Sequence, residues 1–452
     1  MVKNNNSLCT VPFLFCFYVC FFSCSGEFLA STSDLSDLPE QEIEETHVID
    51  SADFYGDEIS WDVGEFDSLP DLSPDEINEI GDGMMDENGG VESVDSTEVE
   101  TIELPENRFG IGLVGPGNPS QWDLTHNLTG DGGYIKLIFP GVEPNLTSTP
   151  GEWIDAVCNS YSRNLIPVIR IGPPWGNRRI RNMSDGGSFT SYTQIANKYA
   201  MVVSSVLSCV PPSTPIYFEI HNEPNLCYEW PCQPGEAPPN PAVPANWMHY
   251  SDMAKEYAFF LRDVSNAMRA IGDSRVKITN GGLAPGGVVS CECNGDGSGG
   301  FNPGITALDF IREMQNAVSD IWDKIDAWAT HSYPASGLGY GFFDRYENCG
   351  PGLRFFENEL STAGRSFPVL ITETGWTIHH ESFNWSREEV ADWTVRAYQD
   401  LWLVHPSILG VMPFMLQDPG WDNFAWVDPS GNPYPVYNAV RSLRCSLGIP
   451  PC

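Results

Sequence analysis

The sequence predicts an α/β fold, a (β/α)8 barrel formed by residues 106–452. Eight short and strongly apolar runs recur in this part of the chain, and amphipathic stretches separate them. Strands that are apolar at nearly every position are typical of a parallel sheet covered on both faces. Eight such strands alternating with helices over this length fit a (β/α)8 barrel. A doubly wound open sheet is the alternative, but no glycine-rich dinucleotide-binding motif follows any run.

The predicted strands leave room for a helix between most of them. In chain order they are RFGIGLV (108–114), YIKLIFPG (134–141), IPVIRIGPPW (166–175), PIYFEIHNEPN (215–225), RVKITNGGLAP (275–285), DAWATHSYP (326–334), PVLITETGW (368–376) and ILGVMPFMLQD (408–418). Helical patterns stand between them at 150–164, 191–207, 247–272 and 387–404.

Residues 1–30 have the pattern of a secretory signal peptide. Lys3 supplies a positive start, a run of twelve apolar residues covers Val11 to Phe22, and small residues follow. The run is shorter than the ~20 apolar residues of a transmembrane helix, so a signal anchor is the weaker alternative. No later segment is long enough to cross, and we expect no membrane span after signal cleavage. The expected location is secreted or extracellular, with a cell-wall or lysosome-like compartment as alternatives.

Residues 31–105 differ sharply in composition from the predicted barrel. Between Ser31 and Glu106 there are 26 acidic residues and no Lys or Arg, and the whole chain has a net charge of -38. Such a segment cannot bury enough apolar surface to offset its ordering entropy, so we expect a disordered acidic linker or prosegment. The equal alternative is that it serves only to keep the chain soluble. The negative charge also argues against nucleic acid as a partner.

Two features beyond the signal agree with an oxidising compartment. Acceptor sequences for N-glycosylation occur at Asn127, Asn145, Asn182 and Asn384. Nine cysteines follow the signal, and we expect most of them to form disulfides, with one left over because the number is odd. Cys227 and Cys232 are close in sequence and are candidates for a local bridge. The CEC motif at Cys291 has no His/Cys set at zinc spacing, so we expect no metal site.

The carboxyl ends of the predicted strands carry the residues expected to do chemistry, because a barrel places its active site there. Glu223 stands at the end of the fourth strand and Glu373 at the end of the seventh. Other polar and aromatic candidates at strand ends are Arg170, Trp175, Asn222, His331, Tyr333, Trp376, Trp421 and Trp426. Aromatic planes stack on the apolar faces of sugars, and two opposed carboxylates are typical of a glycosidase.

The motifs HNEPN and LITETGW resemble those of the glycoside hydrolase clan A barrels, which include families 5 and 39. The resemblance in architecture covers residues from Arg108 to about Arg444. It implies that Glu223 is the acid/base, that Asn222 binds the sugar 2-hydroxyl, and that Glu373 is the nucleophile. The segment THSYP resembles the clan's sixth strand, which implies that Tyr333 hydrogen-bonds the nucleophile and that His331 lines a subsite.

Many clan members carry an Arg near the end of the second strand, whereas this chain offers Lys136 there and Arg170 one strand later. That departure leaves the exact family and the role of Arg170 open.

The function expected from these residues is that of a retaining glycoside hydrolase acting on a β-linked polysaccharide or oligosaccharide. We expect a monomer that needs no cofactor and has a carbohydrate as its partner. One alternative is a barrel that has lost catalysis and serves as a carbohydrate-binding or cell-wall structural protein. Another is an interaction protein that acts through its acidic segment. The four tryptophans serve either as sugar platforms or as packing at the barrel rim.

Overall fold

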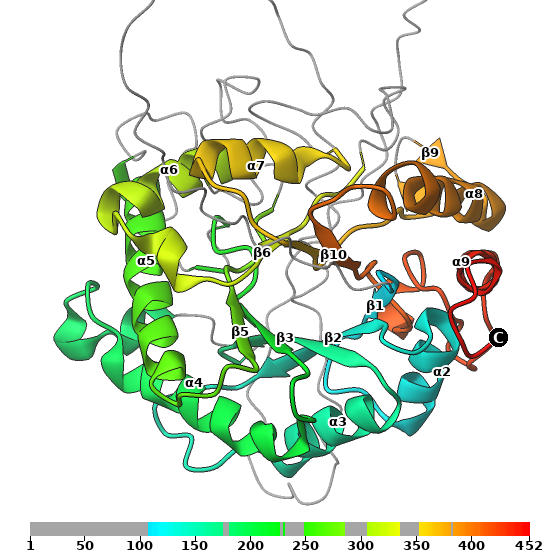
Figure 1. Ribbon diagram of the computed structural model, residues 1–452. Coiled ribbons are helices and arrows are strands. Elements are labelled where there is room, and N and C mark those ends of the chain that lie inside the picture. Colours follow the sequence, from blue (N-terminus) through cyan, green and yellow to red (C-terminus); the bar gives the residue numbers. More distant parts are fainter. Residues whose placement is uncertain are drawn as a thin grey trace, which may run out of the picture. The chain divides into compact units, whose positions relative to one another are not determined.

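Eight parallel strands form the centre of the structure, a computed structural model that describes residues 107–174, 180–226, 229–230, 248–284, 305–334, 352–380 and 383–452. The strands are β1 (Gly110–Gly112), β2 (Tyr134–Pro140), β3 (Ile166–Gly172), β4 (Ile216–Ile220), β5 (Val276–Thr279), β6 (Trp328–Thr330), β7 (Val369–Ile371) and β10 (Ile408–Val411). Each lies inside one of the eight apolar runs, so the predicted strands are confirmed (Figure 1).

The strand neighbours form a closed circuit. β1 to β5 form one parallel sheet in chain order, and β6, β7 and β10 form another. Parallel bridges join the two sheets at both edges, one between Thr279 and Ala327 and one between Phe109 and Val411. Val411 N also donates a hydrogen bond to Arg108 O at 3.0 Å. A circuit of eight parallel strands is the arrangement of a (β/α)8 barrel and not of an open doubly wound sheet.

A helix follows each of these eight strands. The helices are α2 (Pro119–Thr129), α3 (Gly151–Ser162), α4 (Thr193–Val206), α5 (Met248–Arg269), α6 (Ala307–Ala317), α7 (Phe355–Ala363), α8 (Arg387–Ala397) and α9 (Pro435–Ser446). The predicted helical stretches correspond to α3, α4, α5 and α8, while α2, α6, α7 and α9 were not predicted. Several helices begin at side-chain caps: Asn118 accepts from Gln121 N at α2, and Ser386 and Glu389 form a capping box at α8.

Short helical turns and one antiparallel strand pair lie between the main strands and helices of the described residues. The 3-10 turns are η2 (Ile180–Met183), η3 (Asp185–Gly187), η4 (Leu207–Cys209), η7 (Ile321–Lys324) and η9 (Pro419–Trp421), and a π-helical turn η8 (Tyr398–Trp402) continues α8. β8 (His379–His380) and β9 (Phe383–Asn384) form an antiparallel pair between β7 and α8.

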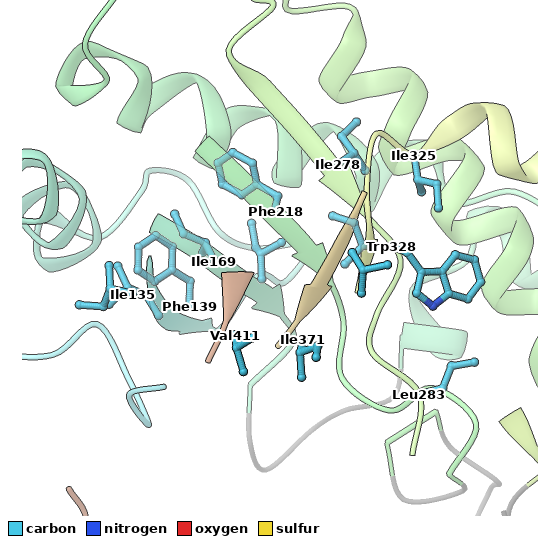
Figure 2. Close-up of a cluster of buried hydrophobic side chains, with 14 of the residues drawn as sticks. Ile135, Phe139, Ile169, Phe218, Ile278, Leu283, Ile325, Trp328, Ile371 and Val411 are labelled. Atoms are coloured by element: carbon cyan, nitrogen blue, oxygen red, sulfur yellow. The ribbon is translucent and has the colours of Figure 1, made fainter. Parts of the chain in front are cut away.

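The outward faces of the strands and the helices share one large apolar core. Ile135, Phe139, Ile169 and Phe218 are fully buried in it (Figure 2). Because side chains alternate across a strand, the residues between them point into the barrel.

The inward-facing residues divide into an apolar layer and a charged layer. Tyr134, Val168, Tyr217, Ala327, Leu370, Leu409 and Met412 form a separate buried cluster. Gly410 makes room for the Tyr134 ring, since a Cβ at position 410 would lie 2.5 Å from it. Two positions further along the same strand faces stand Lys136, Arg170 and Glu219. The apolar cluster therefore fills the barrel interior on the amino-terminal side of the charged residues.

Among the described residues, a disulfide joins Cys158 of α3 to Cys209 of η4. Cys445 and Cys452 are free thiols. The candidates Cys227 and Cys232 lie outside the described residues, so their predicted bridge stays a prediction. Asn127, Asn145 and Asn182 are exposed, as glycan acceptors must be, and Asn384 is part of β9.

The predicted signal peptide, residues 1–30, and the predicted acidic linker or prosegment, residues 31–105, also lie outside the described residues. No helix that the structure describes is both long enough and apolar enough to span a lipid bilayer.

Candidate active site

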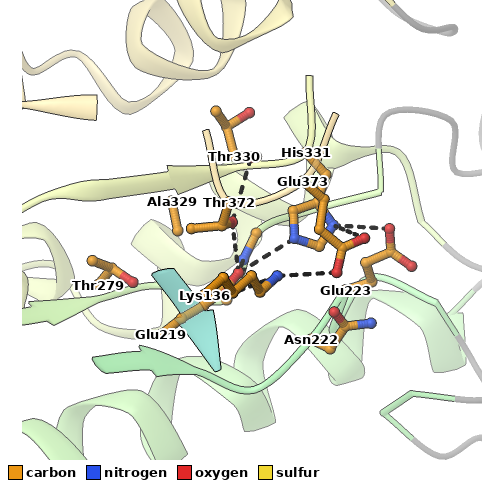
Figure 3. A network of polar contacts seen from close by, with 12 residues as sticks. Lys136, Glu219, Asn222, Glu223, Thr279, Ala329, Thr330, His331, Thr372 and Glu373 are labelled. Atoms are coloured by element: carbon orange, nitrogen blue, oxygen red, sulfur yellow. Dashed lines mark hydrogen bonds and ion pairs between the residues drawn. The ribbon is translucent and has the colours of Figure 1, made fainter. Parts of the chain in front are cut away.

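The structure brings Glu223 and Glu373 together at the carboxyl-terminal side of the strands. Glu223 follows β4 and is 3% exposed, and Glu373 follows β7 and is 6% exposed. His331, which follows β6, lies against both (Figure 3). One oxygen of each carboxylate and one nitrogen of His331 all lie within 4.8 Å of one another. Two carboxyl groups so close together, in a buried site, can act on opposite sides of one small reacting centre.

The backbone that carries Glu223 is in an unusual conformation. Glu223 has a φ of 36° and His221 a φ of 75°, values that residues with a side chain rarely adopt. The chain after β5 supports this turn, because Gly282 O accepts a hydrogen bond from Glu223 N at 3.0 Å. Gly282 cannot be replaced without movement, since a Cβ there would lie 2.3 Å from the His331 ring. Strain of this kind is held by its surroundings and is concentrated at functional sites.

Lys136 of β2 is a cation that contacts the Glu373 carboxylate directly. Its Nζ lies 3.0 Å from Glu373 Oε1 and 3.1 Å from Glu219 Oε2. The side chains of Lys136, Glu219 and Glu373 are 2%, 0% and 8% exposed. An ammonium between two buried carboxylates removes much of the cost of burying either charge.

Glu219 of β4 is a fully buried carboxylate that contacts Lys136 and His331 on the inside of the barrel. Lys136 contacts its Oε2. Its Oε1 accepts hydrogen bonds from Gly282 N at 3.0 Å and from Thr372 Oγ1 at 2.8 Å. His331 Nε2 is 3.3 Å from the same oxygen. Burial alone raises the pKa of Glu219, but Lys136 and His331 outweigh it, so the pKa lies far below its usual value. Glu219 is therefore a permanent negative charge that fixes the positions of Lys136 and His331.

His331 links Glu219 to Glu223. Its Nδ1 lies 3.0 Å from Glu223 Oε1, and the ring is fully buried. Burial lowers the pKa of His331, yet the carboxylates Glu373, Glu219 and Glu223 raise it more, to about 9. The ring is then an imidazolium at neutral pH, with both nitrogens donating. His331 is fully buried and lies against Glu219, Glu223 and Glu373, so its charge stabilises these carboxylates. The subsite role that the resemblance implied for His331 stays a prediction.

Burial raises the pKa of both Glu223 and Glu373, but the neighbouring charges give the two groups opposite net shifts. Burial raises the pKa of Glu223, and the negative charges of Glu373 and Glu229 add to the rise, so the net shift is upward. Burial also raises the pKa of Glu373, but His331, Lys136 and Arg170 lower it more, so the net shift is downward. One group therefore tends to hold a proton while the other stays ionised, which is the division of an acid and a nucleophile.

The hydrogen bond expected of Tyr333 is present. Its hydroxyl donates to Glu373 Oε2 at 3.2 Å, while Lys136 contacts Oε1. Both oxygens of Glu373 thus have donors, which stabilises the ionised form.

Asn222 and Arg170 lie beside these carboxylates. Asn222 Nδ2 donates to Glu229 Oε1 at 2.9 Å. Asn222, Arg170 and Glu229 line a cavity of about 270 Å³, counted with the space open to solvent, together with Ile138, Phe139, Pro140, Gly172, Pro173 and His221. Arg170 is 9% exposed and acts on Glu373 through its charge.

The proposed tryptophan platforms do not all reach the site. Trp376 and Trp426 are 4% and 3% exposed and belong to the large apolar core, so they pack the barrel rim. Trp421 is half-buried and packs edge-on against Phe414 and Phe424. Trp175 lies outside the described residues.

Lys136, Glu219 and Glu229 are site residues that the sequence reasoning did not select. Lys136 and Glu219 had a recognisable signal, since each is a charge within an otherwise apolar strand. Buried charges are rare unless they are paired. Glu229 had no comparable signal, because it lies in a loop and only the fold brings it to Asn222.

Glu223, His331 and Glu373 could offer three ligand atoms to a metal ion. The imidazolium form of His331 has no lone pair to give, and both of its nitrogens already contact carboxylates. The negative charge of the carboxylates in this group is thus balanced by Lys136 and by His331 itself.

No protein-family model matches the chain, and no curated protein matches it either. Solved structures similar to it include a family 39 glycoside hydrolase from the gut symbiont Bacteroides cellulosilyticus WH2, with 18% identity and a TM-score of 0.48 over 76% of this chain and 64% of that chain. A family 39 β-xylosidase from Caulobacter crescentus has 16% identity and a TM-score of 0.44 over 75% and 71% of the two chains. A GH5_18 protein from Bifidobacterium longum subsp. infantis has 14% identity and a TM-score of 0.47 over 75% and 79%. Families 39 and 5 are those that the sequence motifs resemble.

Proposed function

We propose that the chain is a retaining glycoside hydrolase that cleaves β-linked O-glycosidic bonds of a polysaccharide or oligosaccharide. The observation that carries the proposal is the pair Glu223 and Glu373, whose nearest oxygens lie within 4.8 Å and whose pKa values shift in opposite directions. Retaining glycosidases hold their two carboxyl groups about 5–5.5 Å apart, while inverting enzymes need about 6.5–9.5 Å to admit a water.

In the first step, Glu373 attacks the anomeric carbon while Glu223 donates a proton to the departing glycosidic oxygen. Lys136 and Tyr333 keep Glu373 ionised and hold both of its oxygens in place. The His331 imidazolium donates to Glu223 Oε1, so the acidic proton of Glu223 stands on its other oxygen. The product of this step is a glycosyl ester on Glu373.

In the second step, water replaces Glu373 at the anomeric carbon. Esterified Glu373 no longer carries a negative charge, so its contribution to the raised pKa of Glu223 disappears. Glu223 then acts as the base that takes a proton from the attacking water. Two displacements at the same carbon leave its configuration unchanged.

The experiment is a screen of aryl β-glycosides and polysaccharides, followed by proton NMR of the first-formed product. The proposal predicts hydrolysis of at least one β-linked substrate with retention of the anomeric configuration. First-formed product of inverted configuration would contradict the mechanism. Binding of carbohydrate without hydrolysis of any substrate would favour the alternative of a non-catalytic carbohydrate-binding or cell-wall protein.

We further propose that the chain is secreted as a disulfide-bonded glycoprotein, with residues 1–30 removed and the acidic segment 31–105 preceding the catalytic barrel 106–452. The support is the signal-like amino terminus, the exposed acceptors such as Asn127, and the bridge from Cys158 to Cys209. Amino-terminal sequencing and glycosidase treatment of protein purified from its host test this. An unprocessed and unglycosylated chain would contradict it.

A further inference from the structure

The amide of Asn222 is held on one side only. Its Nδ2 donates to Glu229 Oε1 at 2.9 Å. Its Oδ1 is buried and accepts no hydrogen bond from any residue that the structure describes. Asn222 as a whole is 8% exposed, and the residue stands directly before Glu223. A buried acceptor without a partner is uncommon and costs stability, so its presence beside the acid/base calls for a functional explanation.

Glu229 is itself fixed by the chain around it and is 3% exposed. Its backbone N donates to Leu226 O at 3.1 Å, and its backbone O lies 2.8 Å from His221 Nε2. Trp230 packs edge-on against the His221 ring, with centroids 5.6 Å apart. The segment after β4 thus folds back on the end of its own strand and presents the Glu229 carboxylate to Asn222.

The chemistry of the two partners settles which way the amide faces. An ionised carboxylate only accepts hydrogen bonds, so the partner atom on Asn222 must be the NH2 group. The carbonyl Oδ1 is then the atom left to bind something else. A carbonyl oxygen needs a donor, and a sugar hydroxyl next to the scissile bond supplies one.

We propose that Glu229 is a positioning residue that orients the Asn222 amide so that Oδ1 accepts a hydrogen bond from a substrate hydroxyl. This inference rests on the proposed function, and the hydroxyl is the 2-hydroxyl if Asn222 has the role that the sequence resemblance implies. Without the carboxylate, the amide turns freely and presents its donor or its acceptor to the sugar.

The charge of Glu229 has a second consequence for the site. It adds to the rise in the pKa of Glu223, after burial and together with Glu373, while His331 opposes the rise. Arg170 lines the same cavity as Glu229, from β3. Removing the Glu229 charge should therefore lower the pKa of Glu223, which the loss of a purely structural contact would not do.

The test compares wild type, Glu229→Gln and Glu229→Leu with Glu152→Gln, which removes the same charge from an exposed position on α3. The first measurement is a ¹³C NMR titration of the Glu carboxyl carbons, in which Glu223 is assigned by the signal lost in Glu223→Gln. We expect its titration midpoint to fall in both Glu229 variants and to stay unchanged in Glu152→Gln. An unchanged midpoint in all of them would overturn the electrostatic part of the proposal.

The second measurement is the ratio of kcat/KM for an aryl glycoside to that for its 2-deoxy analogue. We expect Glu229→Leu to reduce this ratio several-fold to about tenfold, the value of one hydrogen bond, with a smaller effect in Glu229→Gln, which can still accept from Nδ2. An unchanged ratio in a folded Glu229→Leu would overturn the orienting role. If wild type hydrolyses no glycoside, the proposed function fails, while the NMR titration still decides whether Glu229 acts on Glu223.

Discussion

Replacing Lys136 by methionine tests whether a single buried ammonium keeps Glu373 ionised. Lys136 Nζ lies 3.0 Å from Glu373 Oε1 and 3.1 Å from Glu219 Oε2, in a part of the barrel that is almost closed to solvent. Methionine fills a similar volume without the charge. The variant thus leaves two buried carboxylates with one cation fewer between them.

The size of the effect follows from the short distance between the charges. At an effective dielectric constant of about 20, two unit charges about 3 Å apart interact by about 5 kcal/mol. Loss of the pair therefore disfavours the ionised form of Glu373 by up to this amount and raises its pKa. His331 and Arg170 still lower that pKa in the variant. Water entering beside the shorter, uncharged side chain would also replace part of the lost interaction, so the pKa of Glu373 rises by less than complete loss of the pair would give.

The assay is the pH dependence of kcat/KM on an activated aryl glycoside. Because Glu373 must be ionised to attack, a higher pKa moves the acidic limb of the profile to higher pH. Lys136→Arg keeps a positive charge, so its acidic limb should stay closer to that of wild type. Lys255→Met is the matched control, because Lys255 is 41% exposed and pairs only with surface carboxylates among the described residues.

Thermal unfolding shows whether the variant is folded. Removing one partner of a buried pair destabilises a protein by about 3–5 kcal/mol, so Lys136→Met should melt at a lower temperature but still cooperatively. A folded Lys136→Met whose acidic limb coincides with that of wild type would show that Lys136 does not keep Glu373 ionised.

Three further predictions concern other parts of the chain. Glu223→Gln should reduce kcat/KM, which reports the glycosylation step, by about 10²–10⁴-fold for substrates with poor leaving groups and much less for activated aryl leaving groups; equal losses of kcat/KM for both would argue against Glu223 as the acid. Burial raises the pKa of Glu359 to about 7. Protonated Glu359 therefore contributes stability that is fully present below the pKa of Glu359 in the unfolded chain and is lost as the pH rises through about 7. In Glu359→Gln this pH-dependent loss of about 3 kcal/mol in the free energy of unfolding should be absent, so Tm should depend less on pH than in wild type. The same dependence of Tm on pH in both proteins would contradict this. A chain that starts at Glu106 should fold and keep its turnover, and a much lower Tm would place residues 31–105 inside the domain.

The strands were predictable because their environment is uniform. A parallel strand that is covered on both faces must be apolar along most of its length, and β2, β3 and β4 show this pattern directly in the sequence. α2 was harder to recognise, because only Trp122, Leu128 and two threonines are buried along its eleven residues. A helix with so narrow an apolar face has little periodicity to detect.

The two carboxylates were predictable and their supports were not. Glu223 and Glu373 each end a strand within a short motif, so their position on the barrel follows from the chain order. The pairing of Lys136 on β2 with Glu373 after β7 depends on the closure of the strand circuit, which brings together residues 237 positions apart. For Trp376 and Trp426 the sequence left sugar binding and rim packing open, because it cannot distinguish a tryptophan exposed at the rim from one packed beneath it, and both side chains are buried.

A retaining mechanism requires that Glu373 form a covalent glycosyl intermediate, with Glu223 as the acid/base. Trapping with an activated 2-deoxy-2-fluoro aryl glycoside and mass spectrometry of the peptides test it most directly. The expected result is a gain of one fluoroglycosyl group on the peptide that contains Glu373, and no gain there in Glu373→Gln. A label on Glu223 or on another residue, or hydrolysis that never yields a labelled enzyme and gives product of inverted configuration, would contradict it.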